Sequence, residues 1–353
     1  MPDALNWTPA ALATIRTIGL SRLDWDEPVA LACSGGVDST ALLLLAAAMR
    51  DQLAPFVAIH VDHRTRPETA SEGRQVADLC EALDVPFFAA QVDAEWQTGE
   101  HVAEHRLRSA RYEALARVVA AQGLSAVVTA HTQDDQVETI LMRLFAGAGS
   151  SGSAGMQSIS AISTTCGTLT ILRPLLGVTR RDLIRVLESA NVEPIEDPSN
   201  VETRYTRNAL RHEIIPALQR LFPGFPTTLL RSMALIRDDA ATVDEIAQDA
   251  IAQMVEASGS VVRVDRAALR RASRPVASRV VRHVARDVSA MGAEADWREL
   301  SAERVDAVLT AVRGRTGARI ELPYSVDVVI ERTWLVFQQR GGRGDDDGRP
   351  ADG

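Results

Sequence analysis

The chain has 353 residues, a hydrophobic share of 46% and a formal net charge of −9, which indicates a globular protein with room for two or three domains. No apolar run reaches the roughly 18 residues of a membrane helix and the first residues do not resemble a signal peptide, so we expect a cytoplasmic protein with no membrane partner. All 38 basic residues are arginine, which excludes a Walker-type lysine on phosphates and a lysine Schiff base.

The first half of the chain alternates short apolar runs with longer helical patterns. Strands are predicted at Val29–Cys33, Phe56–Val61, Phe87–Val92, Ala126–Ala130 and Leu169–Leu172. Helices are predicted at Ser39–Arg50, Thr69–Leu83, Val102–Ala121, Gln133–Phe145 and Arg180–Ala190. Such alternation predicts an α/β fold with a doubly wound parallel sheet, Rossmann-like in architecture. Ligands bind such sheets at the carboxyl ends of the strands, where we therefore expect the functional side chains.

The most informative segment follows the first predicted strand and reads Ser34-Gly35-Gly36-Val37-Asp38-Ser39-Thr40. A glycine-rich turn between a strand and a helix directs backbone N–H groups and the helix dipole at an anion. We therefore expect a nucleotide's phosphates to bind the loop residues Ser34, Gly35, Gly36, Val37, Asp38 and Ser39. A carboxylate does not bind phosphate directly, so Asp38 predicts a bound divalent cation. The alternative is an ordinary turn that is rich in Gly and Ser.

Two further polar segments follow predicted strands. His60-Val61-Asp62-His63-Arg64 ends the second strand, and we expect His60 and Asp62 to face the nucleotide. The alternative is a solvated polar turn.

The second of these segments, His131 to Thr139, follows the fourth strand and contains three acids. Asp134 and Glu138 are spaced i,i+4 and Asp135 and Glu138 i,i+3, so the carboxylates cluster on one helix and need a cation, either a metal or a substrate ammonium group. A helix cap formed by Thr132 and Asp135 explains one or two of the acids, but not His131 or Glu138.

The rest of the chain has a different pattern. Residues 147–155 form a glycine- and serine-rich loop, either a linker or a lid. Helices are predicted at Thr227–Glu256, Ala267–Asp287 and Glu303–Val312, and strands at Ala318–Leu322, Val326–Ile330 and Thr333–Phe337. We therefore predict a nucleotide-binding catalytic domain over residues 1–215, a basic helical region over 216–290, a small α/β region over 291–340 and a disordered tail over 341–353.

The basic helical region holds eight arginines between Arg263 and Arg286, against one acid, Asp265. Such a surface suits contacts with RNA phosphates, for which we select Arg270, Arg274 and Arg282. The alternative is a solvated helix face in an arginine-rich protein.

The glycine-rich loop resembles the PP-loop of ATP-dependent adenylating enzymes. Together with the His60 and His131 segments it is similar to the tRNA(Ile)-lysidine synthetase family. Further similar segments are Arg108-Ser109-Ala110-Arg111-Tyr112, Arg173-Pro174-Leu175-Leu176, Glu196-Asp197-Pro198-Ser199-Asn200 and Arg207-Asn208-Ala209-Leu210-Arg211. Two positions depart from the family: Arg64-Thr65-Arg66 replaces a usual glycine, and Ala146 stands where an arginine is common.

The resemblance implies that ATP adenylates the C2 oxygen of the wobble cytidine in tRNA(Ile) with a CAU anticodon. L-Lysine then attacks C2 through its ε-amine and expels AMP. The implied catalytic residues are Asp38, His131, Asp135, Glu138 and Arg207, and Mg²⁺ is the divalent cation that the resemblance implies at Asp38. Asp134, Asp135 and Glu138 would hold lysine, and Arg207, Arg211 and Arg111 would face anionic groups. The oligomeric state is not implied, and a homodimer is one option.

Three other functions are compatible with the same loop. A PP-loop tRNA thiolase generally needs paired cysteines, whereas Cys33, Cys80 and Cys166 lie far apart in the sequence. A small-molecule ligase or amidotransferase would not need the basic C-terminal half. A non-catalytic nucleotide- or RNA-binding module would bind ATP and tRNA without producing AMP.

Overall fold

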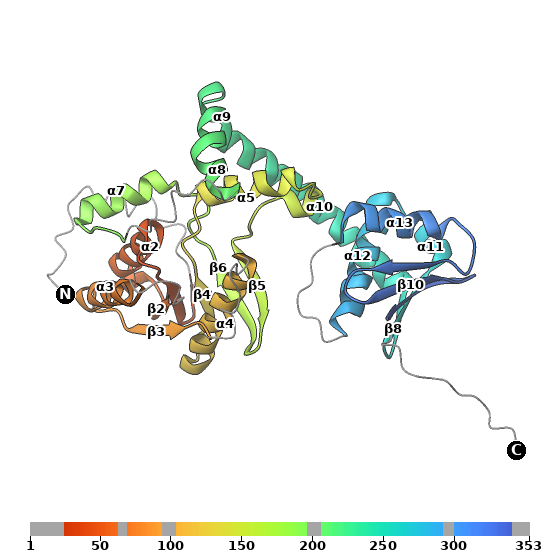
Figure 1. Cartoon of the computed structure of the whole chain (residues 1–353), viewed down its shortest axis with the longest axis horizontal. Helices are drawn as coiled ribbons and strands as arrows, with labels where there is room; N and C mark the ends of the chain where they lie inside the picture. The colour runs from red at the N-terminus through yellow and green to blue at the C-terminus, as the bar shows by residue number, and fades with distance from the viewer. Residues whose placement is uncertain (1–24, 63–68, 94–103, 196–205, 292–299, 341–353) are drawn as a thin grey trace, which may run out of the picture. The chain divides into compact units, whose positions relative to one another are not determined.

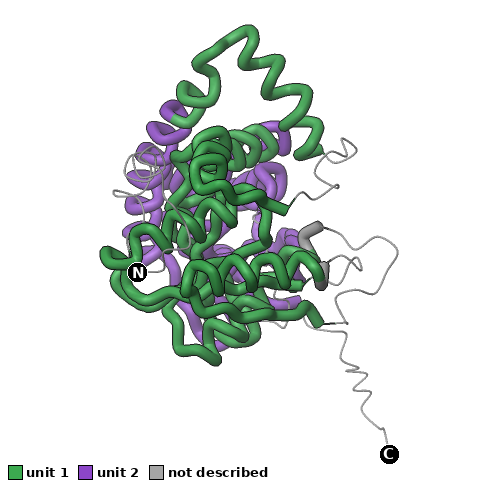
Figure 2. Tube along the Cα trace, turned by 90° about the vertical axis from the view of Figure 1, so that its left-hand side faces the viewer, with its two compact units in different colours: residues 1–143, 155–230 green, residues 144–154, 231–353 purple. Residues whose placement is uncertain are grey.

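The structure, a computed structural model, describes residues 25–62, 69–93, 104–195, 206–291 and 300–340. The chain forms two compact units. The first comprises residues 1–143 and 155–230, and the second comprises residues 144–154 and 231–353 (Figure 2). Among the described residues no helix is long and apolar enough to cross a membrane.

The first unit contains a six-stranded sheet in the order β3-β2-β1-β4-β6-β5. Its strands are β1 (Val29–Ala32), β2 (Phe56–Asp62), β3 (Phe87–Gln91), β4 (Ala126–Val128), β5 (Ile159–Thr164) and β6 (Gly167–Leu172). Neighbouring strands are parallel except for β5 and β6, which are antiparallel. The predicted parallel α/β fold is therefore confirmed. The additional edge strand β5 was not predicted, because its serines and threonines resemble the loop that precedes it.

Helices cover both faces of this sheet (Figure 1). Side chains of α2 (Val37–Ala48), α3 (Thr69–Ala82) and α7 (Arg180–Ala190) share one buried core with β1. On the opposite face, α4 (Glu104–Gln122) packs through Tyr112, Leu115 and Val119. Because β1 lies between β2 and β4, the carboxyl end of β1 is the point where the strand order changes direction, which is where such sheets bind ligands.

A helical segment after the sheet carries the remaining arginines of the candidate site. It consists of α8 (Thr206–Ala209), a π-helical turn (Leu210–Ile214), α9 (Ile215–Leu221) and the start of α10 (Phe225–Met254). Leu210 is buried against Val137 and Leu141 of α5 (Gln133–Phe145). This contact fixes the segment that bears Arg207 and Arg211 against the helix that bears the acids.

The second unit contains an antiparallel sheet in the order β7-β8-β11-β10-β9. Its strands are β7 (Val255–Ser258), β8 (Val261–Asp265), β9 (Arg319–Leu322), β10 (Val326–Ile330) and β11 (Trp334–Gln339). The helices α12 (Arg274–Ala290) and α13 (Ala302–Val312) pack on it around a core rich in valine. Because β8 pairs with β11, the predicted boundary at residue 290 falls inside this unit.

Two features of the second unit correct the sequence analysis. The predicted helix Ala267–Asp287 is two helices, α11 (Arg266–Arg271) and α12, because Ser273 has an extended backbone at the N-cap position of α12 and Pro275 occupies the first turn of α12. The loop at residues 147–155 contains a single helical turn, α6 (Ser150–Ser153), whose N-cap is Gly149.

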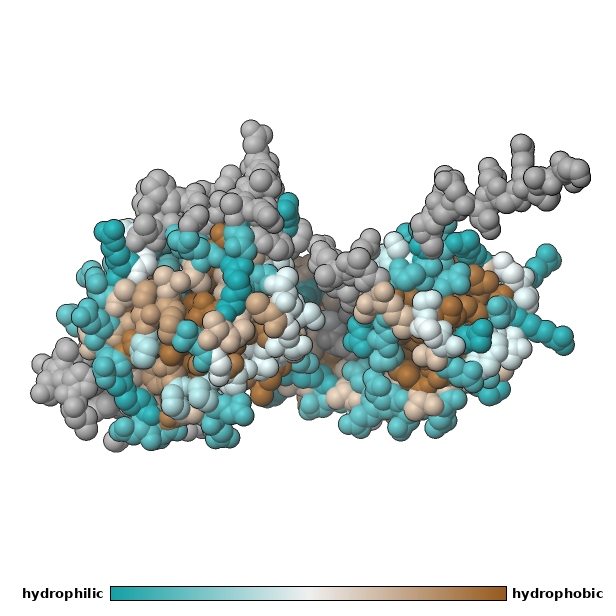
Figure 3. Space-filling model, turned by 90° about the horizontal axis from the view of Figure 1, so that it is seen from below, coloured by the Kyte–Doolittle hydropathy of each residue, from teal (hydrophilic) through white to brown (hydrophobic). Residues whose placement is uncertain are grey.

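One arginine of the basic region is structural. Arg266 is 8% exposed, and it donates to the carbonyls of Val312 at 2.9 Å, Gly314 at 2.6 Å and Glu331 at 2.9 Å. Its charge is directed inward, onto the ends of α13 and β10. Hydrophilic residues nevertheless cover much of the face of each unit that Figure 3 shows.

Candidate active site

The loop from Ser34 to Thr40, here called the phosphate loop, is held in place by its own side chains. The hydroxyl of Ser39 accepts from the backbone N–H of Ser34 at 3.1 Å and lies 3.0 Å from the Ser34 hydroxyl. Thr40 donates its hydroxyl to the carbonyl of Gly35 at 2.8 Å. Gly36 is the N-cap of α2 and lacks a side-chain cap, so the first N–H groups of the helix remain available to an anion.

Gly35 offers a direct test of this loop. Its φ is +87°, and a Cβ there would lie 2.3 Å from Cδ1 of Ile195 and 3.2 Å from Cγ2 of Val76. We expect Gly35→Ala to weaken ATP binding at least about tenfold and to cost about 1–3 kcal/mol of stability, because the loop must move to relieve strain and overlap. Calorimetric titration with ATP and thermal denaturation measure the two effects.

The matched control is Gly123→Ala. Gly123 also has a positive φ, +63°, but in the described part of the chain no atom beyond its chain neighbours lies within 4 Å of its Cβ position. This variant should lose stability only through backbone strain and should bind ATP normally. Unchanged ATP affinity in folded Gly35→Ala would contradict the assignment of the loop.

Asp38 lies at the start of α2 and is 22% exposed. Its Oδ2 atom accepts from Nη1 of Arg180 at 2.8 Å, while its Oδ1 atom is buried and has no hydrogen-bond partner among the described residues. Burial raises the pKa of Asp38 to about 6, partly offset by Arg180. The unpaired Oδ1 atom fits a metal ligand. Among the described residues no three His, Cys, Asp or Glu side chains form a metal site, so Mg²⁺ there would need phosphate oxygens or water as further ligands.

His60 supports the loop from the neighbouring strand. It is 5% exposed, and its Nδ1 atom lies 2.9 Å from the carbonyl of Cys33, the residue before Ser34. The histidine is therefore not part of a solvated turn. Asp62 ends β2 and is half-buried. His63 and the departure at Arg64-Thr65-Arg66 lie outside the described residues.

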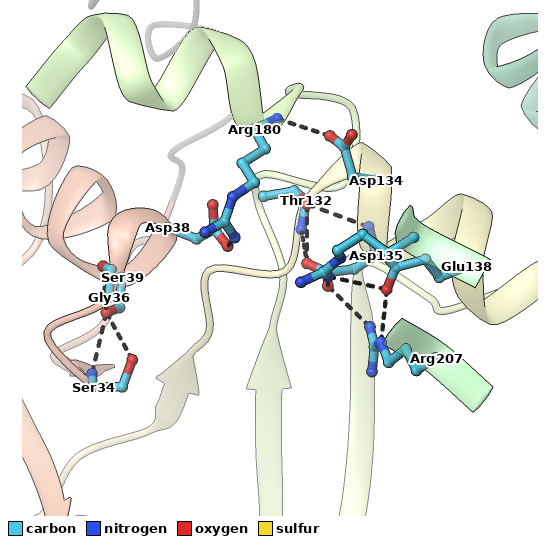
Figure 4. A network of polar contacts seen from close by, with 11 residues as sticks. Ser34, Gly36, Asp38, Ser39, Thr132, Asp134, Asp135, Glu138, Arg180 and Arg207 are labelled. Atoms are coloured by element: carbon cyan, nitrogen blue, oxygen red, sulfur yellow. Dashed lines mark hydrogen bonds and ion pairs between the residues drawn. The ribbon is translucent and has the colours of Figure 1, made fainter. Parts of the chain in front are cut away.

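The three predicted acids lie in the first turns of α5, where arginine side chains pair with Asp135 and Glu138 (Figure 4). Glu138, whose side chain is 1% exposed, accepts from Nε of Arg207 at 2.7 Å and from Nε of Arg211 at 2.6 Å. Asp135 accepts from Nη2 of Arg207 at 2.9 Å. The acids lie together, as their spacing predicts, and the two arginines that the resemblance assigns to anionic groups contact them here.

Asp135 also has the predicted capping role. Its Oδ2 atom accepts from the backbone N–H of Thr132 at 2.8 Å and from the Thr132 hydroxyl at 2.9 Å. Because Oδ2 accepts the capping hydrogen bonds, it is Oδ1 that accepts from the arginine side chains. Asp134 is exposed and accepts from the backbone N–H of Arg180 at 2.8 Å. The cap and the cation site therefore share Asp135.

His131 is held by the hydroxyl of Thr129, which lies 2.9 Å from its Nδ1 atom. Burial lowers the pKa of His131 to about 3; Asp135 opposes this shift, and Arg108, Arg173 and Arg111 add to it. The imidazole is therefore neutral at pH 7 and can accept a proton only weakly.

Arg111, another predicted site residue, contacts an aromatic ring. Its guanidinium stacks on the Tyr112 ring at 5.4 Å from the ring centroid.

The lowered pKa of His131 predicts a dependence of stability on pH. In the unfolded chain the imidazole takes up a proton below pH 6.5, whereas in the native protein it does so only near pH 3. Lowering the pH from 6.5 to 5 should therefore destabilise the protein by about 2 kcal/mol more than it destabilises His131→Asn. Urea denaturation at a series of pH values measures the difference, and parallel curves would contradict the assigned burial.

The second unit contains a basic cavity of about 690 Å³. The cavity is lined by residues of the loop at 147–155, of α10 and of α12, including Arg274, Arg282, His283 and Arg286. Arg274 pairs with Asp306 at 2.8 Å, and Nε of Arg282 donates to the carbonyl of Leu300 at 3.3 Å. Arg270 is exposed on α11. Arg143, one turn before the departure at Ala146, donates to the carbonyl of Gly155 at 2.7 Å.

Sequence reasoning missed Arg180, which contacts both Asp38 and Asp134. A signal was present, because Arg180 and Arg181 open a helix whose positive dipole end disfavours cations. Two arginines at such a position indicate that an anionic group, either of another part of the protein or of a ligand, lies nearby.

Known proteins resemble this chain over most of its length. Residues 16–218 match the PP-loop domain family. A tRNA(Ile)-lysidine synthase of Thermobifida fusca is 34% identical over 90% of this chain and 95% of its own length. One of Salinispora tropica is 34% identical over 83% of this chain and 86% of its own length.

Other matches cover less of the relative's length. The tRNA(Ile)-lysidine synthase of Novosphingobium aromaticivorans is 42% identical over 58% of this chain, and the match spans 62% of that relative. The chain spans 65% of the enzyme from Geobacter sulfurreducens.

Among solved structures, the U34-tRNA thiolase NcsA from Methanococcus maripaludis, with its [4Fe-4S] cluster, aligns with a TM-score of 0.51. The alignment covers 65% of this chain and 78% of the thiolase at 15% identity, so the likeness concerns the fold alone. The PP-loop match covers more than half of the chain, and two relatives match along most of their length at 34% identity; the chain belongs to the tRNA(Ile)-lysidine synthase family of PP-loop proteins.

Proposed function

We propose that the protein uses ATP to join L-lysine to C2 of the wobble cytidine of tRNA(Ile) with a CAU anticodon, producing lysidine, AMP and pyrophosphate. The observation that carries this proposal is the link between two sites. Arg180 connects Asp38 of the phosphate loop to Asp134 of the acidic helix start, which also bears Asp135 and Glu138 (Figure 4). A loop for ATP and a carboxylate cluster for an ammonium group thus meet at one edge of the sheet.

In the first step, the phosphate loop would bind the β- and γ-phosphates of ATP. The N–H groups at the start of α2 and the hydroxyls of Ser34 and Ser39 would donate to their oxygens. Mg²⁺ bound at Asp38 would supply positive charge for the leaving pyrophosphate. His60 would keep the end of β1 in position through its contact with Cys33.

In the second step, the carboxylates of Asp135 and Glu138 would bind the ammonium groups of lysine, with Asp134 beside them. Arg207 and Arg211 occupy these carboxylates in this structure, so they would exchange them for the lysine carboxylate or the adenylate phosphate. His131 is neutral at pH 7 but a weak base. The rate would therefore depend mainly on holding the amine close to C2.

The tRNA would contact the basic surface that holds Arg270, Arg274 and Arg282. The cavity lined by Arg274, Arg282 and Arg286 is concave and rich in guanidinium groups, which suits phosphodiester contacts. Such contacts give affinity that falls steeply with salt, and the choice of one tRNA would rest on its shape and on unstacked anticodon bases.

The test is AMP release from ATP with a tRNA(Ile) transcript and L-lysine together, and with each omitted. We expect release to require both, and lysine to be attached to the RNA by mass spectrometry. A transcript with uridine at the wobble position is the matched control and should not react. Release that needs tRNA but ignores lysine would keep the adenylating site and favour a thiolase. Binding of ATP and tRNA without any AMP would favour a non-catalytic module.

A further inference from the structure

Arg180 has no role in the two steps above, yet its guanidinium lies at the phosphate loop. Its Nη1 atom donates to Oδ2 of Asp38 at 2.8 Å, across 142 residues of sequence. The two side chains are 35% and 22% exposed. Figure 4 shows the side chain extending from α7 to Asp38.

The backbone around Arg180 is fixed at several points. Thr179 caps α7 by accepting from the N–H of Asp182 at 3.2 Å, and the N–H of Arg180 donates to Asp134 at 2.8 Å. Leu183 and Leu187 of the same helix are buried in the core shared with α2. The Cα position of Arg180 is thus set by packing, and only its side chain can move.

The partner of Arg180 in this structure is also the carboxylate that the metal would use. Oδ1 of Asp38 is buried and unpaired, while Oδ2 holds the guanidinium. A divalent cation on Asp38 would repel a guanidinium a few ångströms away and would bring phosphate oxygens with it. A long arginine side chain on a fixed helix would then find its nearest anion in those phosphates.

We propose that Arg180 is a catalytic residue that leaves Asp38 when the metal and nucleotide bind and donates to the pyrophosphate leaving group. In the reaction proposed above, on which this inference rests, the C2 oxygen forms a bond to the α-phosphorus. The bond from that phosphorus to the bridging oxygen breaks, and its electron pair stays on pyrophosphate. Arg180 stabilises that charge through N–H donors and transfers no proton.

Two binding measurements without turnover test the proposal on Arg180→Met. Mn²⁺ alone, followed by electron paramagnetic resonance, should bind more tightly, because a competing cation has been removed from Asp38. Pyrophosphate with Mg²⁺, followed by calorimetry, should bind about 10- to 100-fold more weakly, because a charged donor to the phosphate is lost. A purely structural arginine would not shift the two affinities in opposite directions.

Arg185→Met is the matched control. Arg185 lies on the same helix, is 54% exposed and pairs only locally with Asp182 at 3.1 Å, so both affinities should match those of the parent protein. If Arg180→Met does not fold, Arg180→Lys replaces it, since a single ammonium keeps the charge but loses the planar fork. That variant should show the same signs with smaller shifts.

Kinetics complete the test. With tRNA and lysine present, Arg180→Met should release pyrophosphate about 100-fold more slowly, and Arg180→Lys should recover part of the loss. Unchanged pyrophosphate affinity, or weaker binding of both Mn²⁺ and pyrophosphate, would overturn the proposal. The binding measurements need neither tRNA nor lysine, so they test the contact between Arg180 and pyrophosphate separately from lysidine formation, whose failure would refute the proposed function.

Discussion

Asp38→Asn should reduce AMP release at least about 1,000-fold while leaving the protein as stable as before, or more so. The catalytic loss follows because an amide lacks the charge that holds Mg²⁺ against the phosphates, and electrostatic groups of this kind commonly contribute 10²–10³ or more to rate. The measurement is single-turnover release of AMP with tRNA and lysine at saturating ATP.

The stability of Asp38→Asn follows from the pKa of Asp38. Burial raises this pKa from 3.8 to about 6, so above pH 6 the ionised carboxylate destabilises the native state by up to about 3 kcal/mol. The cost vanishes below pH 4, where the group is protonated in both states. Asparagine removes the cost at pH 7 but also removes the partner of Arg180, which offsets part of the gain.

The control for this prediction is Asp51→Asn, an exposed acid just after α2 in the turn Arg50–Gln52. It should change neither rate nor melting temperature. A marked drop in melting temperature for Asp38→Asn, together with loss of activity, would mean that the ion pair with Arg180 is chiefly structural.

Glu138→Gln should have the largest effect on stability. Glu138 is 1% exposed and binds both Arg207 and Arg211. Removing its charge leaves two guanidinium groups with a single remaining partner, Asp135. Breaking a buried pair costs about 3–5 kcal/mol, and we expect about 3, because the two arginines are 30% and 26% exposed. Urea denaturation at pH 7 measures the loss.

The same variant should separate the two steps of the proposed reaction. Adenylation depends on the phosphate loop and should persist wherever the protein is folded, whereas the KM for lysine should rise at least about 100-fold, as expected for a lost buried charge contact. The control for stability is Asp84→Asn. Asp84 is 81% exposed and pairs with Arg50 at the surface, so this variant should lose less than about 1 kcal/mol of unfolding free energy. Normal lysine kinetics in folded Glu138→Gln would remove Glu138 from the lysine site.

Local signals in the sequence predicted helix ends well. Helices Gln133–Phe145 and Arg180–Ala190 were predicted to the residue, because each has a capping side chain at its start and α7 ends at Asn191 in the left-handed conformation. The strands β5, β7 and β8 were missed because serine and glycine around them resemble loops. Their pairing depends on other strands, β6 for β5 and β11 for β8.

In the candidate site, too, local features could be predicted and contacts between distant residues could not. The phosphate loop and the acidic helix start are contiguous segments, so the sequence could show them directly. The cations that occupy the acids come from 69 and 73 residues away, and Arg180 reaches Asp38 across 142 residues. Only the packing of α5 against Leu210 and of α7 against α2 brings these groups together.

The arginine–carboxylate cluster bears on how lysine would be distinguished from free arginine. Asp135 and Glu138 accept hydrogen bonds of 2.6–2.9 Å from guanidinium groups in this structure. The shape and charge of this site therefore do not exclude the guanidinium of free arginine. Reactivity would then supply the discrimination. An ammonium group with a pKa near 10.4 can give up a proton and attack carbon, whereas a guanidinium, whose pKa is higher still, stays protonated with its lone pairs delocalised. Free arginine would act on such an enzyme as an inhibitor and not as a substrate.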